Sequence, residues 1–345
     1  MWLDPACPSR RTPGSKFAWG VATASSTFGN TLNPLDPTRI PGGSSGGAAA
    51  AIGFGAVAAG LGTDTGGSVR IPAALCGVVG FKPTQGLWST QGIFPLAAGL
   101  DHPGLLGASV DDTIVLATAL GTEVQRGNAW RSARLGVIRE IAPVPLSPEV
   151  SAPFEQGIDV LQRAFAVQPL DTPSLFEGVF KSFATIVLTE GGMEHFRRND
   201  WAFITAHYGA ETVERLEFAH SVVRRDYALA QQARRRFSEK LHRLMSTVDY
   251  LVLPTSPCTA PAVGEATLAI GNWSGTVREA LMTYTAPFNM AGFPAISIPL
   301  AAEEHRLPAA LQIVARPGEE AELLHVAQNI EHMFKAGRPL AARKK

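Results

Sequence analysis

Two serines in glycine-rich stretches are the residues of this sequence best suited to chemistry. Ser44 lies in the glycine-rich run at 41–47, and Ser68 ends a second such run at 62–68. Glycine allows backbone conformations with positive φ and lets a bound molecule approach main-chain N–H groups closely. N–H groups that converge in this way can bind an oxyanion. The two serines therefore predict nucleophilic catalysis.

Four consecutive main-chain N–H groups lead up to the helix that we expect after the second serine. They belong to Thr65, Gly66, Gly67 and Ser68, and Pro72 suits the first turn of that helix. The N-terminus of a helix has unpaired N–H groups and a partial positive charge, so it attracts anions. We expect these groups to form an oxyanion hole, in which loss of one donor typically costs ~3 kcal/mol of transition-state stabilisation.

The segment between the two loops, residues 46–60, is almost entirely Ala, Gly, Val, Ile and Phe and carries no charge. This composition predicts a tightly packed, buried helix that holds the two serines at a fixed separation. Asp64 and Arg70 flank the second serine. We expect them to form a polar pair that stabilises the loop, in preference to contacting a substrate directly.

The rest of the chain alternates between helix and strand patterns, which predicts an α/β fold with a sheet between layers of helices. Three helices and two strands stand out from the spacing of apolar residues. The helices are expected at 148–165, 223–244 and 323–334, and the strands at 250–253 and 295–299.

The overall composition is that of a soluble enzyme. Of the 345 residues 46 % are hydrophobic, which is enough for a large core. Thirty basic and thirty acidic side chains balance, so charge gives no reason to expect nucleic acid or an anionic membrane as a partner. The N-terminus has no apolar signal core, and no uncharged stretch is both long and apolar enough to cross a bilayer.

The cysteines and histidines give no sign of a disulfide framework or a metal site. Cys7, Cys76 and Cys258 are an odd number without CxxC spacing, which favours the reducing cytoplasm. The eight histidines show no metal-binding spacing, so we expect no metal. The run GGSSGG lacks the lysine and serine or threonine that end a phosphate-binding loop.

Several motifs, in order along the chain, resemble those of the amidase signature family of serine hydrolases. They are FAWG at 17–20, GGSSGG at 42–47, GTDTGGSVRIPAALCGVVGFKPT at 62–84, Leu100-Asp101, DYLVLPT at 249–255, PFNMAGFPAI at 287–296 and LQIV at 311–314. The resemblance covers roughly residues 17–334. It implies a central sheet, mostly parallel or mixed, sandwiched between helices.

The resemblance also implies a domain organisation. Residues 17–345 would form one domain that lacks the family's N-terminal part, with a signature core over about 17–120 and a variable half over about 135–335. Residues 1–16 resemble nothing in the family.

The catalytic residues implied by the resemblance are a Ser–cis-Ser–Lys triad. Matched position by position, Ser68 is the nucleophile and Ser44 is the bridging serine behind a cis peptide bond from Gly43, with Ser45 supporting the same loop. A serine hydroxyl becomes a good nucleophile when a neighbouring base takes its proton. A neutral, desolvated lysine can do this through a second hydroxyl.

The lysine of the triad has no match in this sequence. In the family it lies far upstream of GGSSGG, whereas here the only lysine before Ser44 is Lys16, which stands where the family usually has glutamate. We therefore do not assign the catalytic role to Lys16, and Lys82 belongs to a structural motif of the family. The sequence resembles a shortened family member, and a truncated gene, a misplaced start and a pseudoenzyme all stay open.

These observations predict a cytoplasmic amidase that needs no cofactor. Ser68 would attack the carbonyl of a small-molecule amide, ammonia or an amine would leave, and water would release the acid. One alternative is a protein similar to the A-type subunit of an amidotransferase, which acts on glutamine and aminoacyl-tRNA and needs partner subunits. Another is a catalytically dead remnant that serves as a binding or scaffold protein. A homodimer is compatible with each interpretation.

Overall fold

One large mixed sheet forms the centre of the fold, with its strands in the order β1-β3-β2-β9-β10-β6-β4-β5. A computed structural model describes residues 16–24, 29–124, 129–172, 174–300 and 306–336 of the chain. The strands of the sheet are β1 (Ala59–Asp64), β2 (Val79–Lys82), β3 (His102–Gly107), β4 (Arg134–Val137), β5 (Ala166–Pro169), β6 (Tyr250–Pro254), β9 (Ala295–Pro299) and β10 (Ala310–Val314). Neighbours pair antiparallel from β1 to β6, whereas β6, β4 and β5 pair parallel. Of the two expected sheet types, the mixed one is confirmed.

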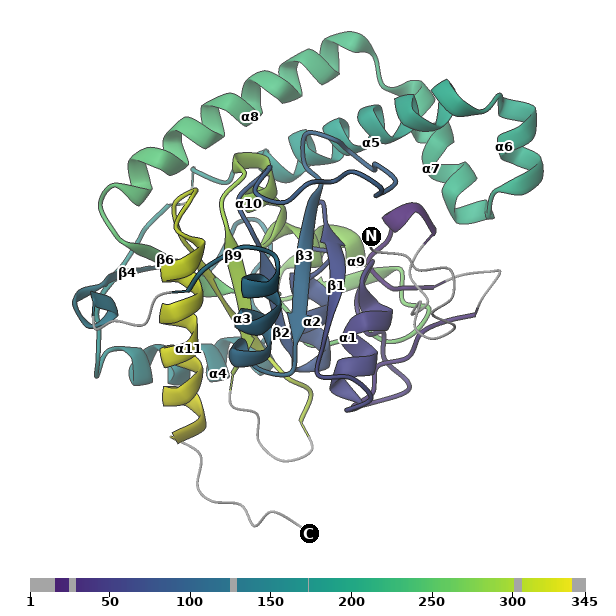
Figure 1. Ribbon diagram of the computed structural model, residues 1–345. Helices are drawn as coiled ribbons and strands as arrows, with labels where there is room; N and C mark the ends of the chain where they lie inside the picture. Colours follow the sequence, from purple (N-terminus) through teal and green to yellow (C-terminus); the bar gives the residue numbers. More distant parts are fainter. Residues whose placement is uncertain (1–15, 25–28, 125–128, 173, 301–305, 337–345) are drawn as a thin grey trace.

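Helices cover both faces of this sheet (Figure 1). Those of the first half are α1 (Gly46–Gly53), α2 (Arg70–Cys76), α3 (Val110–Ala119) and α4 (Pro148–Leu161), with short 3-10 helices at Lys16–Ala18 and Ala129–Ser132. Those of the second half are α5 (Val179–Arg198), α6 (Trp201–His207), α7 (Ala210–Ser221), α8 (Arg224–Met245), α9 (Val277–Thr283), α10 (Ala286–Ala291) and α11 (Glu320–Ala336). A hairpin of β7 (Thr267–Ile270) and β8 (Trp273–Thr276) is separate from the large sheet.

The central strands are buried on both faces, which explains why they are continuous apolar runs. In β6, Leu251 and Leu253 belong to one apolar cluster, which includes residues of α5, α8, α9 and α10. Val252 between them belongs to a second cluster, which includes residues of α3, α4 and α11. Successive side chains of a strand point to opposite faces, so a strand between two helical layers has no polar side. The two strand predictions are confirmed in β6 and β9.

The three helices expected from apolar spacing are confirmed as α4, α8 and α11. Helix α4 begins at Pro148, where the missing N–H of proline removes no helical hydrogen bond. It ends at Leu161, earlier than expected, and Phe165 beyond its end still packs into the core.

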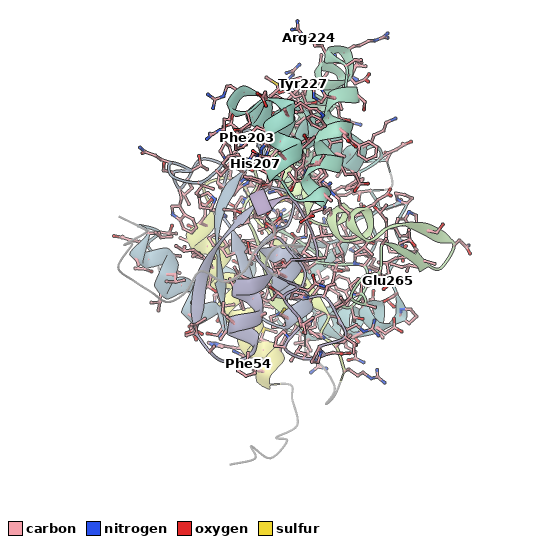
Figure 2. The ribbon with its side chains drawn as sticks, turned by 90° about the vertical axis from the view of Figure 1, so that its right-hand side faces the viewer. Phe54, Phe203, His207, Arg224, Tyr227 and Glu265 are labelled. Carbon is pink, nitrogen blue, oxygen red and sulfur yellow. The ribbon has the colours of Figure 1, made fainter. Side chains whose placement is uncertain are left out.

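The expected helix over 46–60 is wrong in its second half. Helix α1 ends at Gly53, and Gly55 has a φ of +81°, a conformation that residues with a side chain rarely adopt. The chain then turns into β1, which pairs with β3. Phe54 at the turn is 80 % exposed and lies at the lower end of the molecule in Figure 2. The connection between the two serine loops is therefore a short helix followed by a strand.

Helices α5 to α8 form a layer of their own, with α6 and α7 at its outer end (Figure 1). Figure 2 shows Phe203 and Arg224 in this layer, far from Phe54. Its inner side reaches the N-terminal segment, because the rings of Phe17 and His195 lie 4.6 Å apart between centroids. None of the helices that the structure describes has the length and apolarity needed to cross a bilayer.

Candidate active site

The two serine loops lie directly against each other. The main-chain N–H of Ser45 donates to the main-chain carbonyl of Ser68 over 3.1 Å. The Ser45 hydroxyl is 3.3 Å from both the N–H and the carbonyl oxygen of Thr63, at the end of β1. Ser44 and Ser68 are each 5 % exposed. The structure thus brings together the two serines that the sequence singled out.

The first serine loop is packed too closely for side chains at its glycines. The peptide bond between Gly43 and Ser44 is cis. A Cβ on Gly43 would lie 2.9 Å from the carbonyl oxygen of Gly20, closer than real Cβ contacts allow. The Thr23 hydroxyl donates to the carbonyl of Gly42 over 2.7 Å. Contacts with the backbone of residues 20–22 and with the Thr23 side chain therefore fix the position of this loop.

The second serine loop folds around the carboxylate of Asp64. This carboxylate accepts hydrogen bonds from the N–H groups of Gly67 and Val69, over 2.8 and 3.1 Å. It also forms an ion pair with Arg70 at 2.9 Å, and both side chains are fully buried. Burial alone would raise the pKa of Asp64, but the charge and hydrogen bonds of Arg70 outweigh burial and hold the pKa well below its usual range.

Arg70 connects this loop to the second half of the chain. Its guanidinium donates to the carbonyl of Thr285 over 3.0 Å and to the side-chain oxygens of Gln312 and Asn289, each over 2.6 Å. Thr285 in turn donates to the carbonyl of Gly66 over 2.7 Å. These partners were missed at the level of sequence. Asn289 and Gln312 lie within motifs that carry the family resemblance, but nothing in their spacing indicates what they bind.

A second buried carboxylate holds the start of the loop. The Thr65 hydroxyl donates to Asp101 over 2.5 Å, and the other oxygen of Asp101 accepts from the N–H groups of Leu96 and Ala97 over 2.8 and 3.1 Å. Burial raises the pKa of Asp101. Asp101 also belongs to the Leu100-Asp101 motif of the family resemblance, but the sequence alone does not indicate its role.

The loop glycines differ in what their N–H groups are free to do. The N–H of Gly67 donates to Asp64 over 2.8 Å, whereas those of Thr65, Gly66 and Ser68 have no such carboxylate partner. Side chains are excluded here too, because a Cβ on Gly66 would collide with Phe183 and Met282. At Gly67, where φ is +126°, it would collide with Thr285. The N–H groups of Thr65, Gly66 and Ser68 remain as candidates.

A small cavity lies beside Ser68. Its polar groups are the hydroxyls of Ser68 and Thr65, the guanidinium of Arg278 and the indole N–H of Trp19, which is buried without a hydrogen-bond partner among the described residues. The remaining lining residues are Ala18, Gly20, Val21, Leu96, Phe183, Val187 and Met282. The pocket is thus made by the N-terminal segment, the serine loop and helices α5 and α9, which lie far apart in sequence.

The lysines that the structure describes do not contact the two serines through hydrogen bonds. Lys82 is fully buried and its Nζ donates to the carbonyl of Pro83 over 2.9 Å. Burial, followed by repulsion from Arg70, lowers the pKa of Lys82 well below its usual value. The side chain of Lys16 lies outside the described residues. Within the described ranges, no three His, Cys, Asp or Glu side chains are grouped in a way that could hold a metal ion.

Comparison with known proteins places these loops in a family. The family model described as Amidase matches residues 6–324. The A-type subunit of the glutamyl-tRNA(Gln) amidotransferase of Thermosynechococcus vestitus is 33 % identical over 364 residues, which are 93 % of this chain and 73 % of that protein.

Solved structures agree with this match. One described as a crystal structure of amidase is 31 % identical, with a TM-score of 0.82 over 92 % of this chain and 72 % of that one. The structure of 6-aminohexanoate cyclic dimer hydrolase complexed with substrate is 29 % identical, with a TM-score of 0.78 over 95 % and 75 % of the two chains. These similarities in sequence and fold, together with a family match over most of its length, show that the chain belongs to the amidase signature family, whose enzymes cleave amide carbon–nitrogen bonds.

Proposed function

We propose that this protein is a serine amidase in which Ser68 is the nucleophile. The Ser68 oxygen attacks the amide carbonyl, the carbon–nitrogen bond breaks, and the nitrogen takes a proton and leaves as ammonia or an amine. Water then attacks the resulting ester and releases the acid with Ser68 restored. One observation carries this proposal: Ser68 lines the cavity and its carbonyl is hydrogen-bonded to the residue that follows Ser44.

We further propose that Ser44 relays the proton of Ser68 and that the oxyanion is bound by the N–H groups of Thr65, Gly66 and Ser68. The close packing of the two loops supports the relay. The bond between Gly67 and Asp64 supports a hole without Gly67, because a donor already paired with a carboxylate is not available to the transition state.

We also propose a domain organisation and a cellular location for this protein. We propose that residues 17–345 form one domain, because strands from both halves belong to the same sheet and Arg70 is bound by residues of the second half. We place it in the cytoplasm, consistent with Cys76 and Cys258, which are both unpaired thiols.

A fluorophosphonate probe, which forms a covalent bond with activated serines, tests the assignment directly. We expect mass spectrometry to find the adduct on Ser68, and Ser68→Ala to abolish labelling. Ser246→Ala, at the exposed end of α8, is the matched control and should label like the wild type. An adduct on another serine, or undiminished labelling of Ser68→Ala, would contradict the assignment.

We expect this protein to turn over amides slowly, because none of the described lysines hydrogen-bonds to Ser44 or Ser68, so the pair has no lysine base among the described side chains. Removing one member of a nucleophile–base unit typically removes most of the rate that the unit supplies. Amide hydrolysis by the purified chain measures this. Fast turnover that depends on Ser68 would overturn the expectation, and Lys82→Ala and Lys16→Ala would then identify the substitute base.

A second candidate function is that of one component of an amidotransferase. It is favoured by the relative from Thermosynechococcus vestitus, whose name describes it as the A-type subunit of a glutamyl-tRNA(Gln) amidotransferase. Purification of the tagged protein from its native cells separates the two functions. Stoichiometric partner subunits would favour the amidotransferase, and a chain recovered alone or as a homodimer would favour the amidase.

A further inference from the structure

Arg278 is a cation at the wall of the cavity beside Ser68, and it has no counter-charge among the described residues. It lies on α9 and lines the same cavity as Ser68. Its guanidinium has no hydrogen bond or ion pair with any residue that the structure describes. Burial, together with repulsion from Arg215, lowers the pKa of Arg278 to about 10, so the side chain stays protonated at neutral pH.

Three other arginines in this protein, Arg70, Arg234 and Arg316, have acceptors. Arg70 is paired with Asp64, and Arg316 with Glu319 at 2.9 Å. Arg234 donates to the carbonyls of Met290 and Gly99 over 2.8 and 2.6 Å. Arg278 is half-buried, and a cation partly withdrawn from water without such partners is unfavourable. Its position beside Ser68 therefore calls for an anionic ligand.

The rest of the cavity wall defines what that ligand can be. The lining residues around Ser68 and Arg278 are mainly apolar, with Trp19, Phe183 and Met282 among them, and none of those described is acidic. A guanidinium presents its N–H donors as a fork that matches the two oxygens of a carboxylate. An ammonium group in the same cavity would find no carboxylate and would be repelled by Arg278.

We propose that the substrate is an amide whose acyl chain ends in a carboxylate, and that Arg278 binds this carboxylate while Ser68 attacks the amide carbonyl. The apolar wall would contact the methylene groups between the two ends. This proposal rests on the proposed amidase function and narrows its substrate to monoamides of dicarboxylic acids. It also disfavours glutamine, whose α-ammonium group has no partner in the cavity.

Binding of the acid product tests the proposal without requiring turnover. Glutarate, 1-pentanol and L-glutamate are titrated separately into the full chain by isothermal calorimetry at neutral pH. Glutarate should bind at least about tenfold more tightly than 1-pentanol, which has the same chain length and no carboxylate, the usual worth of a charge-assisted hydrogen bond. L-glutamate should bind more weakly than glutarate. Equal binding of glutarate and 1-pentanol, or no binding of glutarate, would overturn the proposal.

Variants of Arg278 test whether this residue causes the preference for glutarate. Arg278→Gln should reduce glutarate binding to the level of 1-pentanol, whereas Arg278→Lys should keep part of the preference. Arg236→Gln removes an exposed arginine of α8 that does not line this cavity, and should leave the preference unchanged. A preference that survives Arg278→Gln would refute the role of Arg278. If Arg278→Gln fails to fold, the comparison of ligands on the wild type still decides. Because these readouts do not use the nucleophile, they are independent of fluorophosphonate labelling at Ser68.

Discussion

The main-chain N–H of Ser45 donates to the main-chain carbonyl of Ser68 over 3.1 Å. This single bond joins the start of α1 to the loop before α2, and it fixes Ser44 relative to Ser68 without using either hydroxyl. Both hydroxyls therefore stay available for proton transfer. The catalytic arrangement that we propose depends on backbone geometry more than on contacts between side chains.

In a form of the protein fused to an N-terminal family segment that carries the triad lysine, Ser44→Ala should slow the reaction of Ser68 with a fluorophosphonate by about 10²–10⁴-fold, the usual contribution of a positioned proton relay. The second-order rate constant of labelling, compared with that of the fused protein with Ser44 intact, measures this effect. Reversible binding of glutarate should change little, since Ser44 is not among the residues that line the cavity. A variant that labels at the wild-type rate would exclude Ser44 from the relay.

Breaking the ion pair between Asp64 and Arg70 should destabilise the protein strongly. Arg70→Met leaves a fully buried carboxylate without its cation, and removal of one partner from a buried pair typically costs about 3–5 kcal/mol. Urea unfolding followed by circular dichroism gives the change in free energy of unfolding. Arg139→Gln, which breaks an exposed pair with Glu155, is the control and should cost less than about 1 kcal/mol. Similar losses in the two variants would contradict the structural role of Arg70.

Asp64 should also make stability depend on pH. Its pKa is lower in the folded protein than in the unfolded chain, so its contribution is present above the unfolded pKa of about 4 and is lost as the pH falls below that value. The free energy of unfolding is measured between pH 3 and pH 7 for Asp64→Asn and for the wild type, which will differ in stability at pH 7. On acidification it should decline less steeply in Asp64→Asn than in the wild type. Parallel curves would show that Asp64 does not carry this dependence.

Gly66→Ala should destabilise the serine loop, because the added Cβ would collide with Phe183 and Met282. Overpacking of this kind typically costs about 1–3 kcal/mol. The matched control is Gly60→Ala in β1, where the nearest atom to an added Cβ is 3.8 Å away. Thermal unfolding should show a lower midpoint for Gly66→Ala and little change for Gly60→Ala. Unchanged stability and unchanged labelling of Ser68 in Gly66→Ala would show that the loop has room that the structure does not indicate.

Much of the fold could be predicted from local patterns. Helices α4, α8 and α11 and strands β6 and β9 follow from the spacing of apolar residues, because one helix or strand buries a face set by its own periodicity. The same reasoning placed the end of α1 too late. A run of Ala and Gly has no polar face, so its composition alone could not show where Gly53 and Gly55 let the chain turn into β1.

The sequence by itself determined the family, the two serine loops and the expectation that they act together. Only the tertiary structure decided which side chains bind these loops and line the cavity beside Ser68. Arg70 finds Thr285, Asn289 and Gln312 more than 200 residues away, and the N–H of Gly67 is taken by Asp64. Arg278 reaches the cavity because α9 packs beside the serine loop. Such pairings depend on how distant elements meet across the sheet, and this information is absent from the spacing of residues within any one element.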